Sequence, residues 1–171
     1  MHPPWLDRGG EFPGDDDKLG YAIELARKNV EYETGGPFGA AVFLKDAAHP
    51  VGAGTNGVLR LQSSLLHAEI VALMEAHAVL RSHDLSGHEL FASCEPCAMC
   101  LGAIFAAGID RLVFAARRED AERVGFDEGP VFPESYAYVR DRGLEIVRSD
   151  RRADGAAVIE LYAKRGGPIY G

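Results

Sequence analysis

Two short stretches restrict what this chain folds into more than any other feature: His67-Ala68-Glu69 and Pro96-Cys97-Ala98-Met99-Cys100. Cys97 and Cys100 are three residues apart, so on a helix their thiols lie on one face. The pair follows an expected strand, which places both thiols in the first turn of the next helix. There the helix dipole lowers the pKa of a thiol and favours the thiolate. Two such sulfurs bind zinc at about 2.3 Å, so we expect a zinc ion at this helix start.

His67 and Glu69 are two positions apart, and on a regular helix this spacing turns their side chains about 200° away from each other. Both reach one site only if that site lies beyond the N-terminus of their helix. Ser63 and Ser64 precede them and are candidate N-caps. We therefore expect a helix that begins near Leu65 and faces the same ion as the cysteine helix.

The expected zinc ligands are His67, Cys97 and Cys100. Structural zinc sites usually have four protein ligands, whereas three ligands and an open position indicate catalysis. The open position holds water, whose pKa the metal lowers to about 7. Glu69 is then placed to take a proton from that water and to return it to a leaving nitrogen.

Other interpretations of these residues stay open. A Cys-x-x-Cys pair after a strand is also the pattern of a thioredoxin-like redox site, although the His-x-Glu stretch upstream favours zinc. Cys94 is either a fourth ligand or, as we favour, a small buried residue. A zinc-stabilised domain without catalysis is a further alternative, but such a domain has no use for Glu69 beside the metal.

Charge and composition exclude several classes of partner. The chain has 18 Lys and Arg against 26 Asp and Glu, a net charge of −8. An acidic protein gains little from a phosphate backbone, and the Arg117-Arg118 and Arg151-Arg152 pairs are flanked by acids, so we expect no nucleic-acid partner. No run of about 18 apolar residues predicts a membrane span. Three cysteines and no secretory signal predict reduced thiols in the cytoplasm.

Helical and strand patterns alternate along the chain, which predicts an α/β fold with a mixed five-stranded sheet covered on both faces, a three-layer α/β/α arrangement. Residues 1–14 are rich in proline and glycine and are expected to form an irregular arm, and residues 15–171 a single domain that ends in a helix and an exposed tail. The 96–107 helix is nearly all apolar and is expected to be covered by protein all round. Strands are expected at 39–44, 51–58, 89–93, 111–115 and 144–147, and helices at 15–32, 65–81, 96–107, 119–124, 134–142 and 155–165.

The stretch from Ser93 to Ile104, taken with His67-Ala68-Glu69, resembles the zinc-dependent cytidine deaminase-like superfamily, whose signature is His-x-Glu followed by Pro-Cys-x-x-Cys. Pro37-Phe38-Gly39-Ala40 and Gly125-Phe126-Asp127-Glu128 are similar to segments of the nucleobase branch, which includes guanine deaminases. The resemblance covers about residues 18–130 and implies the three-layer cytidine deaminase-like fold. It also implies Zn²⁺ on His67, Cys97 and Cys100.

The same resemblance assigns further residues to the substrate. Glu69 would move protons, and Glu128 would be a second catalytic carboxylate that accepts N–H groups of a purine. A solvated loop position is an equal alternative for Glu128, and a frayed end is one for Tyr170. For Asn56 the alternative is a turn before Gly57, and we favour the binding role. The residues expected to bind substrate are Phe38, Asn56, Ala68, Asp127 and Tyr170.

These residues predict a hydrolytic deaminase of a small free nucleobase, with the conversion of guanine to xanthine and ammonia as the leading case. Alternatives are cytosine, another amino-heterocycle such as a triazine or pterin, or a nucleoside. Ser63-Ser64-Leu65-Leu66 departs from the Asp-Pro-Thr-Ala of many relatives, which leaves the wall beside the base undetermined. Apolar helices and the exposed tail also predict a homodimer, with an exchanged C-terminal segment as one form of it.

Overall fold

A mixed five-stranded sheet forms the centre of the protein in a computed structural model that describes residues 2–7 and 9–170. The strands lie in the order β2-β1-β3-β4-β5, with β1 antiparallel to β2 and β3, and with β3, β4 and β5 parallel. The fold class predicted from the sequence is thus confirmed. The strands are β1 (Gly39–Leu44), β2 (Pro50–Thr55), β3 (His88–Cys94), β4 (Arg111–Ala116) and β5 (Glu145–Arg148).

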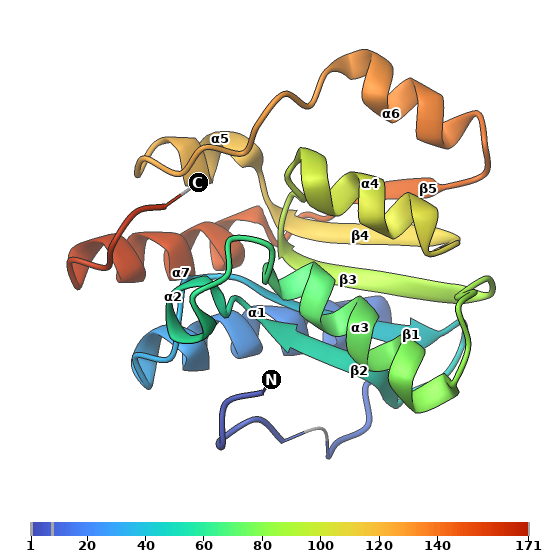
Figure 1. Ribbon diagram of the computed structural model, residues 1–171, viewed down its shortest axis with the longest axis horizontal. Coiled ribbons are helices and arrows are strands. Elements are labelled where there is room, and N and C mark those ends of the chain that lie inside the picture. Colours follow the sequence, from blue (N-terminus) through green and yellow to red (C-terminus); the bar gives the residue numbers. More distant parts are fainter. Residues whose placement is uncertain (1, 8, 171) are drawn as a thin grey trace.

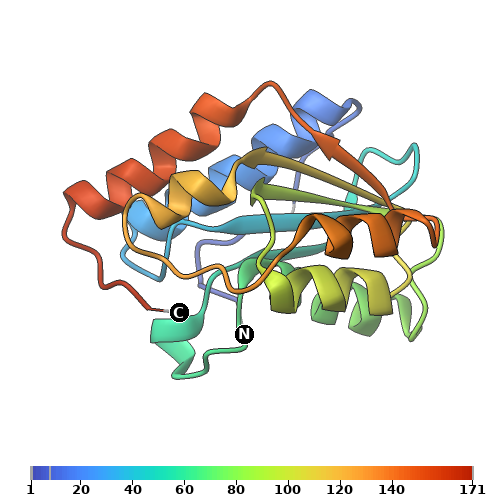
Figure 2. The same ribbon diagram turned by 90° about the horizontal axis from the view of Figure 1, so that it is seen from above.

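Helices cover both faces of this sheet (Figures 1 and 2). Helices α1 and α7 pack on one face, and α3, α4 and α6 on the other. Successive side chains of β1 point to opposite faces of the sheet. Ala41 and Phe43 belong to the core under α1, and Ala40 and Val42 to the core under α3. The helices are α1 (Asp15–Glu31), α2 (Val58–Leu61), α3 (Ala68–Leu80), α4 (Ala98–Ala106), α5 (Arg118–Glu122), α6 (Pro133–Arg140) and α7 (Arg152–Lys164).

Sheet and helices approach so closely at several glycines that a side chain has no room. A Cβ at Gly54 in β2 would overlap the carbonyl oxygen of Ala68, the first residue of α3. A Cβ at Gly39 in β1 would overlap the carbonyl oxygen of Ala22 in α1. The glycine in β2 therefore determines how close the start of α3 lies to the sheet.

Replacing Gly54 with alanine is expected to lower the free energy of unfolding by about 3 kcal/mol, because the added methyl group meets main-chain atoms that have no rotamer to change. Urea denaturation of the purified variant measures this. The matched control is Gly14→Ala, where the backbone is extended and a Cβ meets only Asp17 Oδ2 at 3.4 Å. That change should cost less than about 1 kcal/mol. Equal losses in the two variants would contradict the account of the close approach.

The start of α3 differs from the expectation. The helix begins at Ala68 rather than near Leu65, and its N-cap is His67, which has an extended backbone at φ −67° and ψ 158°. The N-cap roles expected for Ser63 and Ser64 are therefore wrong. The reason is a turn before the helix, in which the Leu66 carbonyl accepts a hydrogen bond of 2.8 Å from the Gly57 amide and holds the chain away from helical geometry.

Two more expectations of local structure need correction. Strand β2 ends at Thr55, and residues expected to extend it or to form a loop make the short helix α2. Helix α4 is not covered all round, because Gly102 and Ala106 are exposed and only Cys100, Leu101 and Ile104 are buried. Elsewhere the ends of helices and strands fall within three residues of those expected.

The two ends of the chain pack against the fold. The arm has no regular helix or strand among its described residues, and the Phe12 amide donates to the Ala48 carbonyl at 2.8 Å. The expected tail of residues 168–171 is exposed at Pro168 and Ile169, but Tyr170 is half-buried, and Gly171 lies outside the described residues. Among those residues, no helix has the length and apolar character needed to cross a membrane.

Candidate active site

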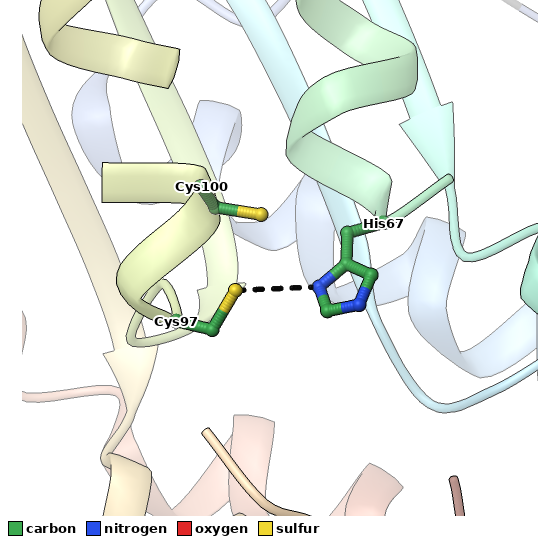
Figure 3. Close-up of side chains that lie close together, drawn as sticks. All are labelled: His67, Cys97 and Cys100. Atoms are coloured by element: carbon green, nitrogen blue, oxygen red, sulfur yellow. Dashed lines mark hydrogen bonds between the residues drawn. The ribbon is translucent and has the colours of Figure 1, made fainter. Parts of the chain in front are cut away.

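Three potential metal ligands converge at the starts of α3 and α4. His67 is the N-cap of α3, Cys97 is the N-cap of α4, and Cys100 follows in the first turn of α4. Their ligand atoms all lie within 4.8 Å of one another. Figure 3 shows both sulfurs and the imidazole ring turned toward a common space, with Cys97 Sγ 3.5 Å from His67 Nδ1.

The sheet places these groups together. Strand β3 ends at Cys94, and two residues later Pro96 leads the chain into α4 at the carboxyl end of the parallel strands, where α/β folds bind ligands. Cys94 itself is buried and its thiol donates to the Arg117 carbonyl at 3.7 Å. Within the part of the chain that the structure describes, Cys94 does not join the metal-binding group. This geometry favours the packing role for Cys94.

The two cysteines of the pair are electrostatically unequal. A hydrogen bond from Cys100, together with one from His67, lowers the pKa of Cys97 to about 4. For Cys100, the hydrogen bond to Cys97 and burial of the thiol both raise the pKa, far above the usual range of a cysteine. Burial acts to lower the pKa of His67, but the Cys97 hydrogen bond and nearby negative charges outweigh it and the pKa is raised. A bound cation would favour the thiolate at both cysteines.

Glu69 lies in the first turn of α3, directly beside this group. It is 8% exposed, and its Oε2 accepts a hydrogen bond from Cys100 Sγ at 3.5 Å. Burial raises the pKa of its carboxyl group, and the negative charge of Cys97 acts in the same direction. A buried carboxyl group at this place can hold a proton or release it close to a bound metal.

Glu128 is a second buried carboxyl group on the same pocket, at 8% exposure. Its loop is fixed to α4, because its carbonyl accepts a hydrogen bond of 3.2 Å from the Ala98 amide. Burial and the charges of Cys97 and Glu69 raise the pKa of Glu128 to about 8. The alternative of a solvated loop acid is therefore wrong for this side chain.

Aromatic and amide groups form the remaining wall of this pocket. Asn56 is 1% exposed, and its Oδ1 accepts hydrogen bonds from the Tyr170 hydroxyl at 2.7 Å and from the Val58 amide at 3.2 Å. Asn56 is therefore a buried wall residue, and its side chain also holds the turn that leads to Val58. Phe126 packs edge-on against Phe38 and Tyr170, with ring centroids 5.1 and 5.4 Å away.

Ala68 and Asp127, the two other residues expected to bind substrate, differ from these wall residues in how far their side chains are buried. Ala68 has its side chain fully buried in the core under α3, so any contact with a ligand would come from its main chain. Asp127 is exposed at the pocket rim, and its Oδ1 accepts a hydrogen bond of 2.9 Å from the Gly129 amide. Sequence reasoning missed Glu95 and Phe126 as lining residues, although both lie within the quoted motifs.

An outer cavity of about 490 Å³ opens in front of this pocket. Apolar side chains of Val58, Leu65 and Met99 line one part of it, and His67, Cys97 and Glu128 lie at its inner end. The inner pocket itself has only about 20 Å³ of free space. A ligand would therefore reach the metal-binding group through the outer cavity.

The sequence matches a known protein family. The sequence model of that family, the cytidine and deoxycytidylate deaminase zinc-binding region, matches residues 15–116, which include all three candidate ligands. The chain belongs to this zinc-dependent deaminase family. The expectation drawn from the two motifs is thereby confirmed, as is zinc as the cofactor.

Individual members of the deaminase family are similar over much of the chain. Guanine deaminase of Bacillus subtilis is 41% identical over 113 residues, which are 66% of this chain and 71% of that protein. A tRNA-specific adenosine deaminase of Buchnera aphidicola is 30% identical over 147 residues, or 84% of this chain and 93% of that protein. A solved guanine deaminase structure from Nitrosomonas europaea superposes with a TM-score of 0.90 at 38% identity, and covers 96% of this chain and 94% of that one.

The candidate ligands of this deaminase fit a zinc ion by their chemistry and spacing. Zinc lies about 2.3 Å from sulfur and about 2.0–2.1 Å from imidazole nitrogen, so a tetrahedral ion separates these two ligand atoms by about 3.5 Å. The observed separation of Cys97 Sγ and His67 Nδ1 is 3.5 Å. Two sulfurs and one imidazole are also a typical donor set for zinc.

Proposed function

We propose that this protein is a zinc-dependent hydrolytic deaminase of a free nucleobase, and that it converts guanine and water to xanthine and ammonia. Two buried carboxyl groups, Glu69 and Glu128, face one pocket beside the His67-Cys97-Cys100 group, and this is the observation that carries the proposal. Sequence and structural similarity to guanine deaminases supports it. His67, Cys97 and Cys100 are the proposed zinc ligands.

His67, Cys97 and Cys100 would hold a zinc ion there, which would supply a water of lowered pKa, about 7, as the nucleophile for the ring carbon that carries the amino group. Glu69 accepts the proton that this water loses. Glu69 passes this proton to the neighbouring ring nitrogen as the oxygen adds to the carbon. It then takes the second proton from the added hydroxyl group and delivers it to the amine, so the carbon–nitrogen bond breaks, ammonia leaves and the carbonyl of xanthine remains. Burial keeps bulk water from exchanging this proton during the reaction.

Glu128 and the wall residues orient the base. Guanine presents N–H groups on its edge, and a carboxylate is a strong acceptor for such donors. A zinc cation beside Glu128 would oppose the raised pKa of this group and favour its carboxylate form. Asn56 would offer its amide N–H groups to the base, because its Oδ1 already accepts hydrogen bonds from Tyr170 and Val58, and the rings of Phe38 and Tyr170 would bound the base. Asp127 holds the loop turn that presents Glu128, and Ala68 offers its main chain.

Glutamine in place of Glu128 is expected to lower kcat/KM for guanine about 100-fold while the zinc content stays unchanged, because a charged acceptor for the ring N–H groups is lost. Steady-state xanthine formation measures this. Glu134→Gln removes an exposed acid on α6 and should leave kcat/KM within about twofold of wild type. If Glu128→Gln retained full activity on guanine, Glu128 would have no role in binding the base.

A homodimer is the proposed assembly. Apolar residues are exposed where α3 and α4 meet, because Met74, at 45% exposure, and Ala106 line one surface hollow together with Ile70 and Ala103. A second copy would cover these groups and complete the burial expected for α4. Sedimentation equilibrium tests this. An exchanged C-terminal segment would make the Tyr170–Asn56 contact between two copies.

The cytoplasm suits such an enzyme, because reduced thiols are required at Cys97 and Cys100. The net charge of −8 disfavours a nucleic-acid substrate, even though a tRNA deaminase is among the relatives. Cytosine, other amino-heterocycles and nucleosides are the competing substrates, and the panel of bases described in the Discussion separates them from guanine.

A further inference from the structure

A buried amide on α1 holds the main chain of the pocket wall. Asn29 is 0% exposed, and its Nδ2 donates hydrogen bonds to the carbonyl of Gly36 at 2.8 Å and to the carbonyl of Asn56 at 2.9 Å. Its Oδ1 accepts a hydrogen bond of 2.7 Å from the Thr34 hydroxyl. These hydrogen bonds tie α1 to Asn56 in the pocket wall and to the 34–36 segment, which leads to the wall residue Phe38.

These bonds fix Asn56 from one side while the sheet fixes it from the other. The Asn56 amide donates to the Phe38 carbonyl at 3.1 Å, so both main-chain polar groups of Asn56 have a partner. A Cβ at Gly35 would overlap the Asn56 carbonyl oxygen, and one at Gly36 would overlap the Tyr170 hydroxyl. The main chain of Asn56 is therefore held tightly, and its side-chain direction follows from its main chain.

The N-terminal arm is hydrogen-bonded to Thr34, which in turn is hydrogen-bonded to Asn29. Trp5 Nε1 donates to Thr34 Oγ1 at 3.1 Å, and the Trp5 ring stacks on Tyr32 with centroids 5.5 Å apart. The Thr34 hydroxyl has one hydrogen, which it gives to Asn29, so it receives the Trp5 N–H on a lone pair. A hydrogen-bond chain thus runs from Trp5 through Thr34 and Asn29 to Asn56.

We propose that Asn29 is a positioning residue for base recognition, which acts through Asn56, and that Trp5 in the arm restrains it. This inference rests on the proposed function. Asn29 does not contact the pocket itself, because its Nδ2 donates to two main-chain carbonyls and its Oδ1 accepts from Thr34. Its loss would leave the buried Asn56 carbonyl without its donor and the Gly36 carbonyl with the Phe38 amide as donor, and it would let the Asn56 segment shift.

The test variant is Asn29→Asp, which keeps the shape and the acceptor oxygen of the side chain but loses both N–H donors. The control is Leu144→Ala, which removes a buried side chain that lines neither the pocket nor the outer cavity. Asn29→Asp should raise KM for guanine about 10- to 100-fold with kcat within about threefold and with zinc content unchanged, because binding is weakened equally before and during the reaction. Thr34→Val and Trp5→Phe should raise KM about threefold, and Leu144→Ala should leave it unchanged.

A double-mutant cycle decides whether Asn29 acts through Asn56. In an Asn56→Ala background, Asn29→Asp should change KM less than about twofold. Effects that multiply, or a KM for Asn29→Asp equal to wild type, would overturn the proposal. If Asn29→Asp does not fold, the same cycle is run with Thr34→Val.

A wild-type protein that releases no ammonia from guanine would reject the proposed function rather than this inference. The inference is then decided by hydrogen exchange of the Asn56 amide. Exchange should become faster in Asn29→Asp and Thr34→Val and stay unchanged in Leu144→Ala. Equal exchange rates in all variants would overturn it.

Discussion

Replacing Glu69 with glutamine is expected to lower the rate of ammonia release from guanine about 1,000-fold, within the range of 10²–10⁴ typical of a lost general acid–base group. The shape of the side chain is kept, but the amide cannot accept a proton from water or return one to the leaving amine. Zinc content should stay at the wild-type level, because His67, Cys97 and Cys100 are untouched. Ammonia is measured by a coupled assay and zinc by atomic emission.

The paired readout separates a chemical role from a structural one. Glu69 accepts a hydrogen bond from Cys100 Sγ, so a structural role would show itself as zinc loss in the variant. Unchanged zinc together with near-wild-type ammonia release would remove Glu69 from the mechanism. Glu134→Gln, on the exposed side of α6, controls for the loss of one acid.

Serine in place of Cys97 is expected to weaken zinc binding by more than about 100-fold and to abolish ammonia release. Replacing a residue that only supports a ligand already costs about 10–100-fold in affinity, and loss of a direct sulfur ligand costs more. The variant should also unfold at a lower urea concentration, because zinc bound only to the folded state stabilises it. Zinc per chain after dialysis, followed by urea denaturation, measures both effects.

Cys94→Ala is the matched control for this experiment. Cys94 is a buried cysteine at the end of β3, three residues before Cys97, but its thiol faces the Arg117 carbonyl rather than His67. Zinc binding should stay at the wild-type level in that variant. Zinc loss on replacing Cys94, or zinc retained after replacing Cys97, would contradict the proposed ligand set.

The metal-binding group could be predicted from the sequence because its spacing is local. Cys97 and Cys100 needed only a strand followed by a helix to face one side, and His67 needed only to stand at a helix start. The start of α3 was placed three residues too early, since the turn that delays it depends on the Gly57–Leu66 hydrogen bond. A hydrogen bond between separate segments cannot be predicted from the spacing of apolar residues along a helix.

Residues brought in by distant contacts were harder to predict. Burial of Glu128 depends on how its loop packs over α4, and the place of Tyr170 depends on a contact with Asn56, far away in the sequence. Asn29 lies among the apolar residues of an amphipathic helix, and nothing in that pattern signals its three hydrogen bonds. The open face of α4 was missed because an all-apolar helix suggests full burial even when a partner is needed to complete it.

Ammonia release by the purified, zinc-loaded protein decides whether guanine is the substrate. It is measured on a panel of guanine, adenine, cytosine, their nucleosides, an aminotriazine and a pterin, with products separated by chromatography. Guanine should yield equal amounts of xanthine and ammonia at a rate far above that of every other compound. A protein that holds one zinc per chain and releases no ammonia from any of them would contradict this expectation.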